Sequence, residues 1–492
     1  MTELGWVGFK KHQQSAFGML LLGCMFTTNS IAAQPETRTN QVSDGGFGLA
    51  GNALQPGAMA GESIAIKGSI VIVGAPNNNN GMGEAYICDG GTLPDPWANN
   101  FNLADLISLT SNAAFGTDVA LLETGIVDRY NMLAVASAPG MGEGMAFVFG
   151  RNNDIGGWTL LESFENTTPG SLGNGFGISV SIDSACVVVG DPTANKQNGS
   201  AHVYLIDSSG TIDANPIIID GSAFLQGGEF GNDVDVLEDM IVIGAPGPLG
   251  GTDADGGRAY LYRITTDSQG TSIDLENTIH GELNTEFRFG TCVAFGSQGK
   301  NKTLAVGMPG MNLMPHQNGT VEIYRDSGDG IFNHEASVVA ELLQFNDNFG
   351  SSVDIDGDLL IVGAPLASTT AVANGVAYIY RNSPSSGSWS PEWMINPTIA
   401  SGGNRFGTSV ATDSGNVVIG APNLDHFLTN GAGIAFLYEE PIDDEWQNDP
   451  RLPQPMVFDR GSFSTGAPQP GFGSAIAVTS TSSGDIALIG DP

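Results

Sequence analysis

The chain has 492 residues and a formal net charge of −36, and 69 of its residues are glycine. Hydrophobic residues make up 41% of it, enough for a buried core, so wholesale disorder is not expected. The acidic balance repels phosphate backbones and anionic membranes, which argues against a nucleic-acid partner. Abundant glycine with 14% charged residues favours many tight turns over long helices.

The N-terminal segment has the features of an export signal. Two lysines precede an apolar stretch at residues 16–26, which is too short to span a bilayer, and small residues follow near position 33. We therefore expect residues 1–33 to be a signal peptide and the mature protein to be secreted or on the cell surface. Anchoring as a lipoprotein through Cys24, within Leu21-Leu22-Gly23-Cys24, is the alternative. No other stretch is apolar and long enough to insert into a membrane.

Two short marks recur along the rest of the chain. A Phe-Gly pair, weakened to Ala60-Gly61 in its first copy, is followed each time by Gly-Ala-Pro or a close variant. In five copies the first glycines of the two marks lie 13 positions apart, a register that chance would not repeat. The repeated units begin near residues 60, 115, 176, 230, 289, 349, 406 and 472.

One unit shows what each repeat encodes. Residues 352–356 alternate polar and apolar side chains, as a half-buried strand does, and Gly357-Asp358 makes a tight turn. Residues 359–362 form an apolar run typical of a buried strand, and residues 375–380 predict a third strand. A more variable fourth strand is expected before the next Phe-Gly pair, for example at 158–161 or 338–343.

Four antiparallel strands per unit of about sixty residues are typical of a propeller blade, since one small sheet cannot bury both of its faces alone. The two marks resemble the FG-GAP repeats of the integrin α-subunit propeller and its bacterial relatives. This resemblance covers roughly residues 44–492. It implies an all-β protein, a β-propeller of seven or eight four-stranded blades.

The number of blades is left open by the sequence. Related propellers have seven blades, whereas this chain has eight units, and the last stops at Pro492 just after its second predicted strand. Three explanations remain: an eight-bladed ring that lacks strands, a longer protein, or a closing strand from residues 41–60. Because an open ring would expose strand edges, we expect the chain to be truncated or incomplete, with its last unit unfinished.

The resemblance also implies calcium sites, because Asp-x-Asp-x-Asp-Gly loops in the family bind this ion through converging oxygen ligands. The one remnant is Asp253-Ala254-Asp255-Gly256, so Asp253 and Asp255 are the candidate metal ligands, with a solvated turn as the alternative. Two other acidic runs, 326–330 and 354–358, are interpreted as hairpin turns, where Asp and Gly are favoured.

No catalytic constellation is recognised. The six histidines are dispersed, and there is no nucleophile elbow or phosphate-binding loop. Asp191 and Asp491 replace the alanine of their Gly-Ala-Pro marks and could face a central channel, but a tolerated substitution at an exposed strand end is the favoured explanation. Of the cysteines, Cys88, Cys186 and Cys292 lie in strand-like runs, and we interpret these three as small buried residues rather than a disulfide framework.

These observations predict a binding or adhesion module that presents loops to an extracellular protein or glycan. The alternatives are an extracellular propeller enzyme acting on polysaccharide or phosphodiester and a purely structural surface protein.

Overall fold

The computed structural model describes the larger part of the chain in two compact units, residues 40–467 and residues 1–39 with 468–492. No helix in the described part is both long and apolar enough to cross a membrane. The described residues are 55, 57–89, 100–124, 130–152, 157–166, 175–224, 227–247, 256–268, 270–281, 288–298, 301–310, 319–326, 328, 330–340, 347–369, 371–383, 387–396, 402–424, 433–440, 456–458, 475–481 and 484–490.

Seven four-stranded antiparallel sheets follow one another along the larger unit, each with its strands in chain order. Blade 1 contains β1 (Ile64–Lys67), β2 (Ile70–Ala75), β3 (Glu84–Asp89) and β4 (Asn100–Asn102), and blade 2 contains β5 (Val119–Glu123), β6 (Tyr130–Ala138), β7 (Met145–Asn152) and β8 (Trp158–Glu165). Blade 3 contains β9 (Val180–Asp183), β10 (Cys186–Asp191), β11 (Ser200–Leu205) and β12 (Ile217–Asp220), and blade 4 contains β13 (Asp233–Leu237), β14 (Met240–Ala245), β15 (Arg258–Asp267) and β16 (Gly270–His280).

The remaining three blades repeat the pattern. Blade 5 contains β17 (Cys292–Gln298), β18 (Asn301–Met308), β19 (Thr320–Asp326) and β20 (Phe332–Val338). Blade 6 contains β21 (Ser352–Asp356), β22 (Leu359–Ala364), β23 (Val376–Ser383) and β24 (Ser388–Ile395), and blade 7 contains β25 (Val410–Asp413), β26 (Asn416–Ala421), β27 (Ile434–Glu439) and β28 (Met456–Phe458). Short helical turns, α1 (Asn78–Gly81) and α2 (Ala194–Gln197), follow the second strands of blades 1 and 3.

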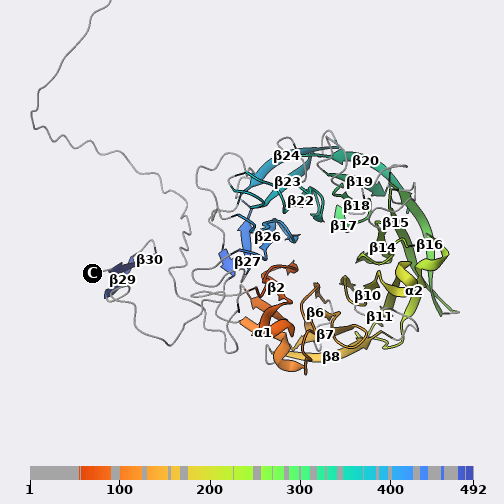
Figure 1. Ribbon diagram of the computed structural model, residues 1–492, viewed down its shortest axis with the longest axis horizontal. Coiled ribbons are helices and arrows are strands. Elements are labelled where there is room, and N and C mark those ends of the chain that lie inside the picture. The colour runs from red at the N-terminus through yellow and green to blue at the C-terminus, as the bar shows by residue number, and fades with distance from the viewer. Residues whose placement is uncertain are drawn as a thin grey trace, which may run out of the picture. The chain divides into compact units, whose positions relative to one another are not determined.

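Blade 7 packs against blade 1 and closes the ring (Figure 1). Ala60 forms a parallel bridge with Gly433, as Phe115 does with Gly83 at another joint. The Ser409 hydroxyl donates to the Gly61 carbonyl at 2.9 Å across the same closure. The ring therefore has seven blades, which decides between the seven and eight that the sequence allowed.

The eighth repeated unit is not a blade of this ring. It forms a two-stranded sheet of β29 (Ala475–Thr481) and β30 (Gly484–Gly490), with Ala475 opposite Gly490. This register matches that of the first two strands of a blade, where Ser352 lies opposite Gly363. The prediction of an inner hairpin in this unit is confirmed, and the ring closes between blades 7 and 1.

Both sequence marks serve the close approach of neighbouring blades. A Cβ added to Gly363, in the Gly-Ala-Pro mark of blade 6, would lie 2.1 Å from the carbonyl oxygen of Gly407 in blade 7. Gly407, in the Phe-Gly pair, has φ +85° and donates its N–H to the Gly420 carbonyl at 2.9 Å. The Gly-Ala-Pro mark needs glycine for space, and the Phe-Gly pair needs it for its left-handed backbone.

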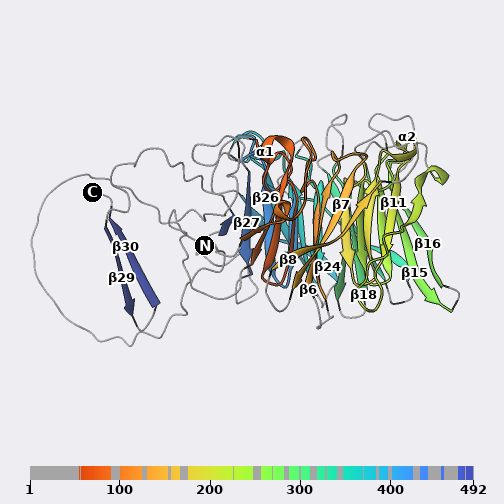
Figure 2. The same ribbon diagram turned by 90° about the horizontal axis from the view of Figure 1, so that it is seen from below.

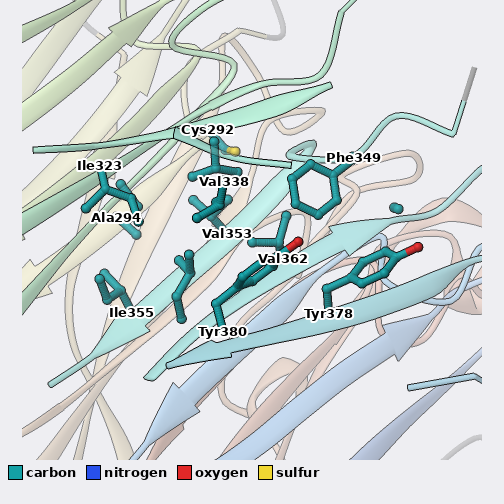
Figure 3. Close-up of a cluster of buried hydrophobic side chains, with 14 of the residues drawn as sticks. Cys292, Ala294, Ile323, Val338, Phe349, Val353, Ile355, Val362, Tyr378 and Tyr380 are labelled. Carbon is teal, nitrogen blue, oxygen red and sulfur yellow. The ribbon is translucent and has the colours of Figure 1, made fainter. Parts of the chain in front are cut away.

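The hydrophobic core lies between blades rather than within one sheet. Figure 3 shows one such cluster, in which Val338 of blade 5 and Tyr378 of blade 6 surround the buried Phe349. The six phenylalanines of Phe-Gly pairs that lie among the described residues are almost completely buried, as expected of residues packed between blades. Seen edge-on in Figure 2, the long strands of the blades run across the thickness of the ring.

Two details of the prediction need comment. The fourth strand of blade 5 is Phe332–Val338. The prediction, which placed this strand at 338–343, was therefore wrong and too far toward the C-terminus. The apolar run at 338–343 attracted the prediction, whereas an outer strand is exposed and more polar than a buried one. The interpretation of Cys88, Cys186 and Cys292 is confirmed, because all three are free and buried.

Candidate functional site: central channel and loop face

A cavity of about 400 Å³ lies at the centre of the ring. Residues of the first strand of every blade line it, from Ile64–Ile66 in blade 1 to Val410 and Ala411 in blade 7. A first strand pairs with the second strand of its own blade and has no strand on its channel side. The N–H and C=O groups that this strand directs toward the channel therefore need hydrogen-bond partners other than a neighbouring strand.

One position supplies a polar link at every joint between blades, and we call it the joint position. It is the second residue after the glycine of each Phe-Gly pair, or of Ala60-Gly61 in blade 1: Ser63, Asp118, Ser179, Asp233, Cys292, Ser352 and Ser409. Four of these side chains donate to the carbonyl of that glycine in the next blade: Ser63 to Gly116 (3.1 Å), Cys292 to Gly350 (3.0 Å), Ser352 to Gly407 (2.9 Å) and Ser409 to Gly61 (2.9 Å).

Two joint positions hold carboxylates that accept rather than donate. Asp118 accepts the N–H of Val119 in its own strand at 3.0 Å and that of Val180 in the next blade at 2.6 Å. Asp233 in blade 4 likewise accepts from Val293 in blade 5 at 2.7 Å. It also accepts from the Ser179 hydroxyl at 2.8 Å, which supplies the joint between blades 3 and 4. The carboxylates thus satisfy N–H groups at the channel edge of the following blade.

A second tier of the same design lies two residues further along. Asp235 accepts the N–H of Phe295 in the next blade at 2.6 Å, and the Ser181 hydroxyl at 2.8 Å. Asp354 accepts the N–H of Thr412 in blade 7 at 2.7 Å. Each aspartate uses one oxygen for its own strand and the other for the next blade, so the side chain ties two sheets together.

Burial dominates the electrostatics of these aspartates. It raises the pKa of Asp118, Asp235 and Asp354 to about 7 and the pKa of Asp233 to about 6, against the lowering effect of the N–H donors. Repulsion between carboxylates adds to the rise in the pKa of Asp118, which faces Asp233. Carboxyls that titrate near neutrality are candidates for acid–base chemistry, yet here both oxygens of each group already accept backbone N–H groups.

The aspartates that the sequence singled out lie elsewhere. Asp253, Asp255 and Asp491 are outside the described residues. In the part of the chain that the structure describes, no three His, Cys, Asp or Glu side chains are grouped to hold a metal ion. Asp191 is fully buried and accepts from the Thr193 hydroxyl at 2.9 Å and from Asn166 at 2.9 Å. It holds the loop after β10 instead of lining the channel.

The sequence analysis missed the channel carboxylates. A signal was present, because the second position after the Phe-Gly glycine carries Ser or Asp in most units, and the fourth carries Ser181, Asp235 and Asp354 in three of them. Alternation of polar and apolar residues was interpreted as a half-buried strand with a solvated face. The strand predicted at 352–356 is confirmed as β21, and Asp354 lies within it and contacts blade 7 rather than belonging to the hairpin turn that was also expected at 354–358.

The two faces of the ring differ in their connections. The face with the Phe-Gly and Gly-Ala-Pro marks, which we call the loop face, has connections of 6 to 12 residues between second and third strands. On the opposite, hairpin face, two residues join the first and second strands in six of the seven blades. The connections between third and fourth strands also lie on the hairpin face and range from 2 to 16 residues, so connection length varies on both faces, whereas the inner strands keep one pattern.

The loop between β22 and β23 shows how such a connection is organised. Buried Asn374 accepts the N–H of Thr369 at 3.0 Å and donates to the Thr369 hydroxyl at 3.0 Å. The carbonyl of Val372 accepts the Gly403 N–H at 2.9 Å, which links the loop to the connection entering blade 7. These bonds hold the Val372 side chain 80% exposed at the tip. An ordered loop with an exposed apolar side chain can contact a partner at little entropic cost.

Comparison with known proteins agrees with this architecture. A family model described as the FG-GAP repeat matches residues 332–380, so the chain is a seven-bladed β-propeller that carries the FG-GAP repeat. No curated protein matches the chain.

Solved structures resemble the chain at low identity. They include a Bacteroides uniformis protein named as a candidate 6-phosphogluconolactonase (11% identity, TM-score 0.47, covering 80% of this chain and 95% of that one). Another is the Pseudomonas aeruginosa periplasmic gluconolactonase PpgL (13%, 0.47, 77% and 93%). A third is Saccharomyces cerevisiae Sqt1 (12%, 0.43, 81% and 85%). Likeness at this level says nothing about activity.

Proposed function

We propose that this propeller is a secreted or cell-surface binding scaffold whose loop face contacts an extracellular protein or glycan, and that it is not an enzyme. The contrast between the inner strands and the loop-face connections carries the proposal. The inner strands repeat one set of blade-to-blade contacts around the ring, whereas the loop-face connections differ from blade to blade. A rigid ring with divergent loops on one face is suited to recognition.

The loop between β22 and β23 is the first place to look for a contact. Its tip exposes Val372 while Asn374 and Gly403 hold the backbone in place. Apolar side chains presented on ordered backbone contribute most when a partner covers them. We therefore assign Val372 to the contact surface.

An enzyme remains the second candidate, because four carboxyls with a pKa near 6 or 7 face the channel. To act as an acid or base, such a carboxyl would have to release an N–H group of the next blade. That release leaves a buried donor unsatisfied, which costs about 1–3 kcal/mol. The joint role explains the same carboxyls without this cost, so we favour the scaffold.

The proposal is tested by screening the full chain against glycan arrays and immobilised extracellular-matrix proteins. If a partner binds, we expect the Val372→Asp variant to bind it at least tenfold more weakly, measured as Kd. Ile331→Asp is the matched control, since Ile331 is 56% exposed in the turn before β20 on the hairpin face. Equal loss in both variants would remove the loop face from the proposal. Hydrolysis of a polysaccharide or phosphodiester that disappears in Asp235→Asn would favour the enzyme.

A further inference from the structure

The hairpin of β15 and β16 is the longest in the ring, and its outer half extends past the rest of blade 4. β14 pairs with β15 as far as Arg263, which lies opposite Met240. Beyond that point, residues 264–267 pair with 270–273 and with no other described strand. We call residues 264–275 the ribbon. It stands at the outer rim of the ring in Figure 1.

The direction of the backbone groups in the ribbon follows from one hydrogen bond. The Ile264 N–H donates to the Asp239 carbonyl at 2.7 Å, so it points away from β16. Ile264 lies opposite Ile273. In an antiparallel pair, the N–H groups of two directly opposed residues either both point toward the partner strand or both point away from it. Ile273 therefore directs its N–H away from β15, and so do Thr271 and Leu275, which lie two positions to either side. These three form a free edge for a further strand.

Several other strand edges of the ring are covered or short. The channel edges of blades 3, 5 and 7 are covered by aspartates of the preceding blade, such as Asp118 and Asp235. Among the outer strands, β4 and β28 have three residues each, and β24 contains Pro391. β16 has eleven residues and contains neither proline nor lysine. The outer strands β8 and β20 also lack both residues, but they are shorter, with eight and seven residues, so β16 offers the longest outer edge.

The charge along the ribbon limits what can pair with it. Asp267 and Asp274 are exposed, and Asp274 accepts the Ser272 hydroxyl at 2.8 Å. The nearby Glu276 pairs with Arg263 at 2.8 Å. A second copy added along this edge would bring further carboxylates to Asp267 and Asp274. A strand with lysine or arginine at alternate positions would meet them with opposite charge. Leu275, 44% exposed, offers one apolar contact on the same edge.

We propose that the β16 edge from Thr271 to Leu275 is a docking edge for an extended, basic segment of a partner protein, which adds to blade 4 as a fifth strand. Main-chain hydrogen bonds supply the affinity in this mode of recognition, and the alternating side chains supply the specificity. The edge lies on the rim, so it functions independently of the loop face.

The test uses the full chain and a fluorescent eight-residue peptide that alternates valine and lysine. Thr271→Pro removes one outward N–H while leaving the ladder to β15 intact, because that N–H is not used in the ladder. Thr271→Val keeps the N–H and is the matched control. We expect anisotropy to show peptide binding that falls at least tenfold in Thr271→Pro and changes less than twofold in Thr271→Val. Amide exchange at Ile273 should slow on binding in the unaltered protein.

Three outcomes would overturn the proposal. The first is equal binding to the proline and valine variants, which would reduce the interaction to general charge attraction. The second is undiminished binding of a peptide N-methylated on alternate residues, a measurement that does not depend on any protein variant folding. The third is dimerisation of the protein in the absence of peptide, measured by light scattering and abolished by Thr271→Pro. That result would make a second copy of the chain the occupant of the edge.

Discussion

The inner strands and the loop-face connections of this propeller use sequence in opposite ways. At the joint position, Ser, Cys and Asp differ in chemistry, yet each makes a hydrogen bond to the next blade. In the connections between second and third strands, length and composition vary while each blade keeps the same register. The difference shows that the hydrogen bond to the next blade is kept around the channel while the residue that makes it changes.

The largest loss of stability is expected when a side chain is added where two blades approach most closely. In Gly363→Ala the new Cβ would lie 2.1 Å from the Gly407 carbonyl oxygen, so blades 6 and 7 must separate. We expect a loss of about 3 kcal/mol or more in the free energy of unfolding, measured by urea denaturation. Gly357→Asn is the control, because nothing lies within 4 Å of a Cβ there and Asn tolerates its φ of +61°. A loss no larger in Gly363→Ala than in the control would contradict the packing argument.

The channel carboxyls predict a pH dependence of stability. Their pKa values in the folded ring are raised by burial to about 6 or 7, from 3.8. The folded state then binds more protons than the unfolded chain, so their contribution is full below about pH 4 and is lost as the pH rises through 6 to 7. We expect a Tm several degrees higher at pH 5 than at pH 8, measured by calorimetry.

A pair of variants separates this effect from the repulsion among surface charges. Asp235→Asn should reduce the difference in Tm between pH 5 and pH 8, because the buried titrating group is gone. Asp267→Asn, at an exposed position, should leave that difference unchanged. If both variants change it equally, the channel is not the source of the pH dependence.

The bond that closes the ring should contribute as much as the same bond elsewhere. Ser409→Ala removes the link to Gly61 between blades 7 and 1, and Ser352→Ala removes the equivalent link between blades 6 and 7. We expect each to lower the free energy of unfolding by about 1 kcal/mol. A much larger loss in Ser409→Ala, measured by urea denaturation, would show that closure is weaker than the other joints.

The smallest effect is expected on the hairpin face, where ion pairs are partly exposed. Arg381 contacts Asp358, Glu392 and Glu440, the last of which follows the third strand of blade 7. Arg381→Gln should cost about 0.5–1 kcal/mol, and the cost should shrink in 1 M NaCl as the charges are screened. A cost that salt does not change would mean that packing of the side chain dominates.

Local pattern made the blades predictable. The strands of residues 352–364 could be located from an alternating run, a Gly-Asp turn and an apolar run, because neighbours in sequence pair with each other in a hairpin. Glycine at the marks and phenylalanine between blades followed from the same repetition. The metal candidates Asp253 and Asp255 remain predictions, since they lie outside the described residues.

The amino-acid sequence alone determined the repeat, the order of strands within a blade and the buried phenylalanines, because these depend on residues close together along the chain. The tertiary structure decided that seven units close the ring and that Asp118, Asp233, Asp235 and Asp354 join the blades. Their partners lie about sixty residues away along the chain. Lys67 forms an ion pair with Asp413, which is 346 residues away. Such contacts form only when every blade has turned by the angle that brings the first beside the last, which no single repeat encodes.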